Sequence, residues 1–174
     1  MRKAIKLDEQ PSYWNTLFLM LEDHVAPLYN KQKDRTGALE VYRRAAEAEQ
    51  RAVALDPKQD AYYFNLGLAQ MQIGDSLHQK SDLPEAETLY QQSEQSFRNA
   101  IQLKDNATVY WENLCRLLMS RATLHEEHGE QADATANYRE ALKALDKAAE
   151  LPGDKSGYSN VRTRLEKKLN NKGD

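Results

Sequence analysis

Residues 60–69 read DAYYFNLGLA, and this stretch opens a helix that we expect to run to about residue 80. Shifting the chain against itself by 48 residues aligns this stretch with its counterparts and needs no gap. One aromatic column then contains Trp14, Tyr62, Tyr110 and Tyr158. The sequence is therefore an internal repeat rather than a chain of unrelated helices.

Other columns keep the same register. They contain Ala4, Ala52, Ala100 and Ala148; Leu7, Leu55, Leu103 and Leu151; Tyr42, Tyr90 and Tyr138; and Ala38, Ala86 and Ala134. Three full units follow, over residues 4–51, 52–99 and 100–147, and a half unit completes the chain. We expect one repeat domain over 1–174, with a stub of a preceding helix at 1–11 and a capping helix at 156–170.

Each unit predicts two helices. The first helices are expected near 12–32, 60–80 and 108–128, and the second near 36–55, 84–103 and 132–151. Proline or glycine lies at the expected boundaries, as in Asp56-Pro57 and Leu151-Pro152-Gly153. Pro27 is expected to kink or divide the first of these helices.

The second helices carry a narrow stripe of small side chains. Seven residues is close to two helical turns, so residues at this spacing share one face. The stripe contains Ala38, Ala45, Ala52; Ala86, Ser93, Ala100; and Ala134, Ala141, Ala148. We interpret it as a packing surface that lets a neighbouring helix approach closely.

These residues resemble the tetratricopeptide repeat (TPR). The family pattern of an aromatic residue followed by Asn-Leu-Gly stands at Phe64-Asn65-Leu66-Gly67, and its Ala, aromatic, Ala pattern at Ala38-Tyr42-Ala45. The resemblance implies an all-α fold, a TPR-like right-handed α-solenoid of about seven long antiparallel helices. Its units are one heptad per helix longer than the usual repeat, as in the last repeat of the photosystem I assembly TPR protein, which the stretch 113–151 resembles.

The family binds ligands on a concave face lined by first-helix side chains. Carried over by position, the resemblance implies a peptide or partner surface of Tyr13, Thr16, Leu17, Met20, Phe64, Asn65, Leu68, Met71, Gln72, Glu112, Asn113, Arg116 and Met119. For Phe64 and the methionines, packing in the core is an equal alternative. A carboxylate clamp is disfavoured, because Thr16, Met20 and Val109 stand where basic groups would be needed.

Nothing in the sequence predicts an enzyme, a cofactor or a metal site. His125 and His128 are three residues apart on a helix, a spacing that could chelate a metal weakly, but their place at a helix end favours solvent-facing histidines that interact with the helix dipole. Cys115 shares the column of Gly67, a small buried position in the family, which favours a core residue over a nucleophile.

The net charge of −3 gives no basic surface for nucleic acid. The apolar run at 17–21 is too short to span a bilayer, and the opening residues lack the apolar core of a signal peptide. With a single cysteine, the chain is expected in a reducing compartment, the cytoplasm or an organelle stroma.

The first helix is apolar nearly all round, and only the stub 1–7 of a preceding helix stands before it. We expect self-association through Trp14, Phe18 and Leu21, as a homodimer, unless the stub folds back over this face or the chain was cut from a longer array. The favoured function is a protein–protein interaction scaffold with a helical groove, in a narrower version an assembly factor. The alternative is a designed or excised repeat array with no cellular function of its own.

Overall fold

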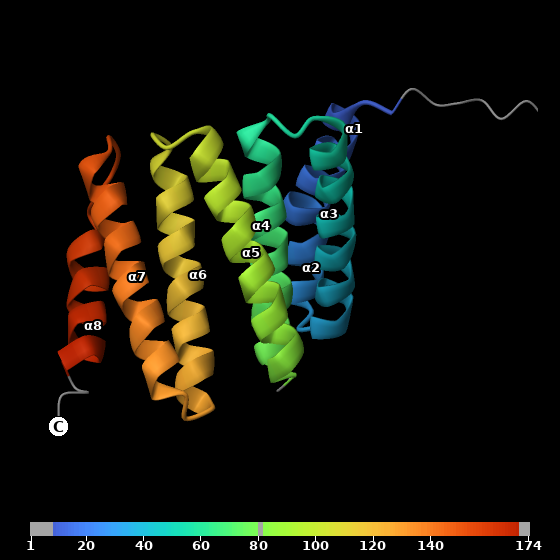
Figure 1. Cartoon of the computed structure of the whole chain (residues 1–174). Helices are drawn as coiled ribbons and strands as arrows, with labels where there is room; N and C mark the ends of the chain where they lie inside the picture. The colour runs from blue at the N-terminus through green and yellow to red at the C-terminus, as the bar shows by residue number, and fades with distance from the viewer. Residues whose placement is uncertain (1–8, 80–81, 171–174) are drawn as a thin grey trace, which may run out of the picture.

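The computed structural model describes residues 9–79 and 82–170, and the elements within these ranges are all helices. They stand side by side in a row, with α1 at one end and α8 at the other (Figure 1). In chain order they are α1 Pro11–Met20, the π-helical turn η1 Leu21–Val25, α2 Ala26–Lys31, α3 Arg35–Leu55, α4 Asp60–His78, α5 Leu83–Leu103, α6 Thr108–Glu127, α7 Gln131–Glu150 and α8 Tyr158–Asn170. The prediction of an all-α solenoid is confirmed.

Helices pair along the row as the repeat predicts. The first helices are α1–α2, α4, α6 and α8, the second helices are α3, α5 and α7, and each packs on its neighbours in sequence. The predicted stub lies largely in residues 1–8, which are outside the described residues, and Pro11 belongs to α1. Proline is well suited to the first turn of a helix, because a backbone N–H at that position would have no hydrogen-bond acceptor within the helix. No helix among the described residues has the length and apolar character needed to cross a membrane.

Pro27 divides the first helix as expected. A proline nitrogen carries no hydrogen, so the helix loses one backbone bond there. The chain accommodates the loss by widening into η1, where the Ala26 N–H donates to Leu21 O, five residues earlier. The remaining turns, α2, continue to Lys31.

The small-residue stripe lies in the core. All nine of its side chains are at most 2% exposed. In the second unit, the aromatic rings of α5 lie against glycines of α4: an added Cβ on Gly67 would stand 2.7 Å from Phe97, and one on Gly74 would stand 2.7 Å from Tyr90. Small residues on each helix therefore let large rings on its partner fill the space between them.

Candidate functional site

Hydrogen bonds join successive first helices, and they use several of the polar residues expected to bind a ligand. Asn65 Nδ2 donates to Asn15 Oδ1 over 2.8 Å, and Gln72 Nε2 donates to Glu22 Oε2 over 2.7 Å. Further along the row, Tyr158 donates its hydroxyl to Glu112 over 2.6 Å. These side chains hold one unit against the next.

Asn65 is the clearest case. Only 9% of its surface is exposed, and its amide also donates to Glu49 Oε1 over 3.3 Å. Glu49 itself has no exposed surface, and burial raises the pKa of its carboxyl to about 7. Asn113, one unit later, donates to Val109 O in its own helix. The structure therefore gives the two asparagines intramolecular partners.

The apolar residues expected in the second unit belong mostly to the core. Met71 is 1% exposed. The ring centroid of Phe64 lies 4.7 Å from that of Tyr110 and 5.8 Å from that of Phe97. Leu68 is half-buried and packs against the same core. The sequence left open whether Phe64 and Met71 contact a ligand or pack in the core. In the structure both pack in the core.

The third unit contains a pocket at its boundary with the last helix. It has a volume of about 440 Å³ and lies where α6, α7, α8 and the connection before α8 meet. Three of the expected ligand-binding residues, Glu112, Arg116 and Met119, line it together. The other lining residues are Cys115, Leu145, Asp154, Gly157, Tyr158 and Val161.

The pocket is apolar inside and charged at its edge. Cys115, Met119, Leu145 and Val161 supply apolar surface, while Arg116 is exposed. Burial raises the pKa of the Cys115 thiol to about 11, so the thiol is neutral near pH 7 and is not an activated nucleophile. Burial and the hydrogen bond to Glu112 raise the pKa of Tyr158 to about 12. This site is suited to binding an apolar group, with one cation and two carboxylates beside it.

The first unit places its expected residues at the open end of the row, which is the α1 end. Tyr13, Thr16, Leu17 and Met20 are exposed. Leu17 lines a hollow of about 360 Å³ with Trp14 on α1, with Leu21 at the start of η1, and with Arg44, Glu47, Ala48 and Arg51 on α3. The Arg51 guanidinium lies 4.5 Å from the Trp14 ring centroid. Tyr13, Leu17 and Met20 are thus far along the row from the pocket beside α8 (Figure 1).

The structure corrects two orientations inferred from the sequence. Phe18 is 3% exposed and belongs to the core, because α1 packs on α3, so it does not line the hollow with the half-buried Trp14 and Leu21. His125 does not face solvent: it is 7% exposed, while His128 is exposed. His125 is buried because α5 and the start of α7 cover the end of α6, so charged partners surround it.

Sequence reasoning missed the part of the pocket beyond α6. The sequence predicts a capping helix at 156–170 but no binding role for Tyr158 and Val161 on it, and Leu145 carries no distinguishing signal. The available signal is that Tyr158 and Val161, three residues apart, share one apolar face of this helix. The width of the gap between α6 and α8 depends on packing against α7, which a single sequence does not give.

Comparison with known proteins gives matches among solved structures only. No protein-family model matches the chain, and no curated protein matches it. The chain is similar to the crystal structure of the Yersinia enterocolitica type III secretion chaperone SycD in complex with a peptide of the translocator YopD. That likeness has a TM-score of 0.46 and 18% identity and covers 92% of each chain. A second structure of the Yersinia enterocolitica type III secretion translocator chaperone SycD gives a TM-score of 0.44 and 15% identity, over 92% of this chain and 90% of that one.

Proposed function

We propose that this chain is a non-enzymatic protein-binding scaffold that anchors an apolar side chain of a peptide in the pocket between α6, α7 and α8. The observation that supports the proposal is the pocket itself. It combines about 440 Å³ of space with a mainly apolar lining and a few charged groups at its edge. Apolar anchoring with polar orientation is the usual basis of peptide recognition in helical grooves.

The charges beside the pocket favour particular peptides. Arg116 can pair with an acidic group next to the anchor, and Glu112 and Asp154 can pair with a basic one. Hydrogen bonds from Ser156 lower the pKa of Asp154, which keeps that carboxylate charged at neutral pH. A peptide with a large apolar residue flanked by opposite charges fits this arrangement.

Selection from a random peptide library against the immobilised chain tests the proposal. We expect selected peptides to share a large apolar residue and to shift the NMR signals of Met119 and Val161. Val161→Phe fills the pocket and should abolish binding, whereas Leu103→Phe, at an exposed position on α5, should not. Peptides that bind both variants equally would contradict the pocket as the site, provided that circular dichroism shows both variants folded.

A narrower role is an assembly factor for a multisubunit complex. Its support is the resemblance of the 48-residue units to the long last repeat of the photosystem I assembly TPR protein. The compartment we propose is a reducing one, the cytoplasm or an organelle stroma, in keeping with the lone buried thiol of Cys115.

We also propose that the open end of the row pairs with a second copy of this chain. The hollow beside Trp14, Leu17 and Leu21 combines apolar side chains of α1 and η1 with Arg44, Glu47 and Arg51 of α3. A two-fold interface places this surface against itself, so an arginine of one copy can meet Glu47 of the other. Both apolar faces would be removed from water at the same time.

A further inference from the structure

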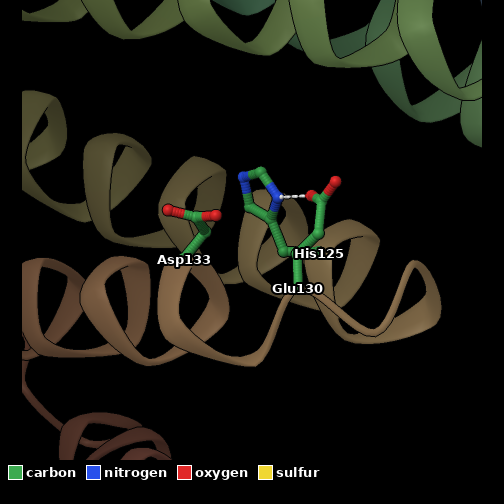
Figure 2. A group of neighbouring side chains, drawn as sticks. All are labelled: His125, Glu130 and Asp133. Carbon is green, nitrogen blue, oxygen red and sulfur yellow. Dashed lines mark hydrogen bonds and ion pairs between the residues drawn. The ribbon is translucent and has the colours of Figure 1, made fainter.

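A buried histidine lies among carboxylates where α6 turns into α7. His125 Nδ1 lies 2.6 Å from Glu130 Oε2, and Nε2 lies 3.6 Å from Glu87 Oε2. Asp133, in the first turn of α7, completes the group, and Figure 2 shows its carboxylate on the other side of the imidazole from Glu130. A neutral imidazole has one N–H, so one of its nitrogens presents a lone pair to a carboxylate. In its protonated form the ring pairs with both carboxylates, and a metal ion at one nitrogen can take the place of that proton.

Packing gives no reason for a histidine here. The same column of the repeat contains Leu77 in the second unit, which is 3% exposed, and Tyr29 in the first. Leucine therefore fills the equivalent space between the two helices of a unit. The third unit alone places an imidazole at this position.

Helix capping does not explain the orientation of Glu130 either. Glu130 is the N-cap residue of α7, but its side chain makes no capping hydrogen bond and turns toward His125 instead. In the first unit the equivalent residue, Asp34, does cap its helix by accepting from the Gly37 N–H over 2.9 Å. The Glu130 carboxylate is thus directed at the imidazole rather than at the helix end.

From this geometry we infer a binding site for a divalent transition-metal ion of the zinc type, with His125, Glu130 and Asp133 as ligands. One ligand atom from each residue lies within 4.8 Å of the other two. Tetrahedral zinc with bonds of about 2.1 Å needs ligand atoms roughly 3.4 Å apart. Glu130 and Asp133 are exposed, so their side chains are free to adjust to that spacing; the 2.6 Å contact between His125 Nδ1 and Glu130 Oε2 has to lengthen as the ion enters.

The surroundings match those of a metal-binding histidine. Such a histidine usually donates its second N–H to a carboxylate, which fixes the ring. Here Nδ1 faces Glu130 and Nε2 faces Glu87, so an ion held by Nδ1 and Glu130 leaves Nε2 directed at the Glu87 carboxylate. Glu87 is itself held by Arg121, whose guanidinium donates to it over 2.8 Å. His128 Nδ1 lies 3.9 Å from Glu130 Oε1 and offers a further nitrogen near the group.

An imidazole with two carboxylates favours zinc over magnesium or calcium, which prefer oxygen ligands alone. Three protein ligands leave a fourth position for water or for a group of a binding partner. The ion would join the end of α6 to the first turn of α7 and hold this helical hairpin closed.

Isothermal titration of the full chain with Zn²⁺ tests the site. We expect one ion per chain, and a binding constant at least about tenfold weaker in Asp133→Asn. His125→Leu should remove this binding while keeping the fold, because leucine stands in the same column at Leu77. Asp82→Asn is the matched control: Asp82 is the N-cap of α5, makes no side-chain capping bond and should leave the affinity unchanged.

Three results would overturn the site. They are no binding of Zn²⁺ to the wild type, equal binding to His125→Leu, and equal binding of Mg²⁺, which would indicate an acidic patch without a role for the imidazole. A second readout is the NMR spectrum, in which Zn²⁺ should shift signals of residues 124–134 before others. Shifts spread over the other histidines or Cys115 would also contradict the assignment.

Discussion

Asn65 Nδ2 donates to Glu49 Oε1 over 3.3 Å, and this contact connects the second helix of one unit to the first helix of the next. The other oxygen of the carboxylate, Oε2, is buried and has no hydrogen-bond partner among the described residues. Burial of the charge outweighs the single hydrogen bond, and the pKa of Glu49 is raised from 4.5 to about 7. The boundary between the first two units therefore contains an acid that is more stable when protonated.

This relationship predicts that the fold weakens as pH rises. Because the folded-state pKa of Glu49 exceeds its unfolded value, its contribution is complete below about pH 4.5 and is lost as pH rises through about 7. A rise in the pKa from 4.5 to about 7 corresponds to roughly 3 kcal/mol. Urea unfolding of the wild type should show a lower free energy of unfolding at pH 8 than at pH 5.

Glu49→Gln should remove most of that slope, because glutamine can still accept from Asn65 but carries no charge. Glu22, whose pKa burial also raises, leaves a smaller slope of the same sign. Glu47→Gln, at an exposed position on the same helix, is the control and should keep the wild-type slope. A variant at position 49 with an unchanged pH profile would show that Glu49 is charged in the folded state without penalty.

Ala100→Leu should overpack the contact between the second and third units. Ala100 has no exposed surface, and inserting three carbon atoms there forces neighbouring side chains off their rotamers at a cost of about 1–3 kcal/mol. Thermal unfolding should show a lower Tm than in the wild type. Ala136→Leu, at an exposed position on α7, makes the same chemical change and should leave the Tm nearly unchanged.

Gly74→Ala should destabilise the chain even though alanine is the better helix former. The gain in helix propensity is about 0.5–1 kcal/mol. The added Cβ would lie 2.7 Å from the Tyr90 ring, which cannot swing away freely because its hydroxyl donates to Asp75 over 2.7 Å. Gly157→Ala meets no atom within 4 Å and serves as the control in chemical denaturation. Equal or greater stability of Gly74→Ala would show that the ring shifts at little cost.

The sequence predicted the helices better than the orientations of individual side chains. The 48-residue period located the second helix of each unit (α3, α5 and α7), because small residues and aromatic rings repeat there in fixed columns. It did not reveal that Asn65 and Gln72 bond to the preceding unit, because an amide at a helix surface looks the same whether it meets a ligand or another helix. His125 was misplaced for a related reason: its burial depends on Glu87 from α5, which is remote in sequence.

The dimer prediction now involves Leu17 rather than Phe18. Phe18 is 3% exposed and packs in the core, so Phe18→Glu should unfold the first unit whether or not a dimer forms. Leu17 is 39% exposed and lines the hollow with Trp14 and Leu21. If two copies pair through this surface, a glutamate at position 17 would bury a charge without a partner, and the dimer should dissociate. Light scattering should therefore give twice the chain mass for the wild type and a single mass for Leu17→Glu.

Leu103→Glu is the matched control for that experiment, because Leu103 is 44% exposed and ends α5, away from the open end of the row. It should keep the mass of the wild type. Circular dichroism on both variants separates loss of pairing from loss of fold, since Leu17→Glu changes an exposed side chain and should leave the helical signal intact. A wild-type chain that stays monomeric at high micromolar concentration would exclude the dimer and leave the hollow beside Trp14 without an assigned partner.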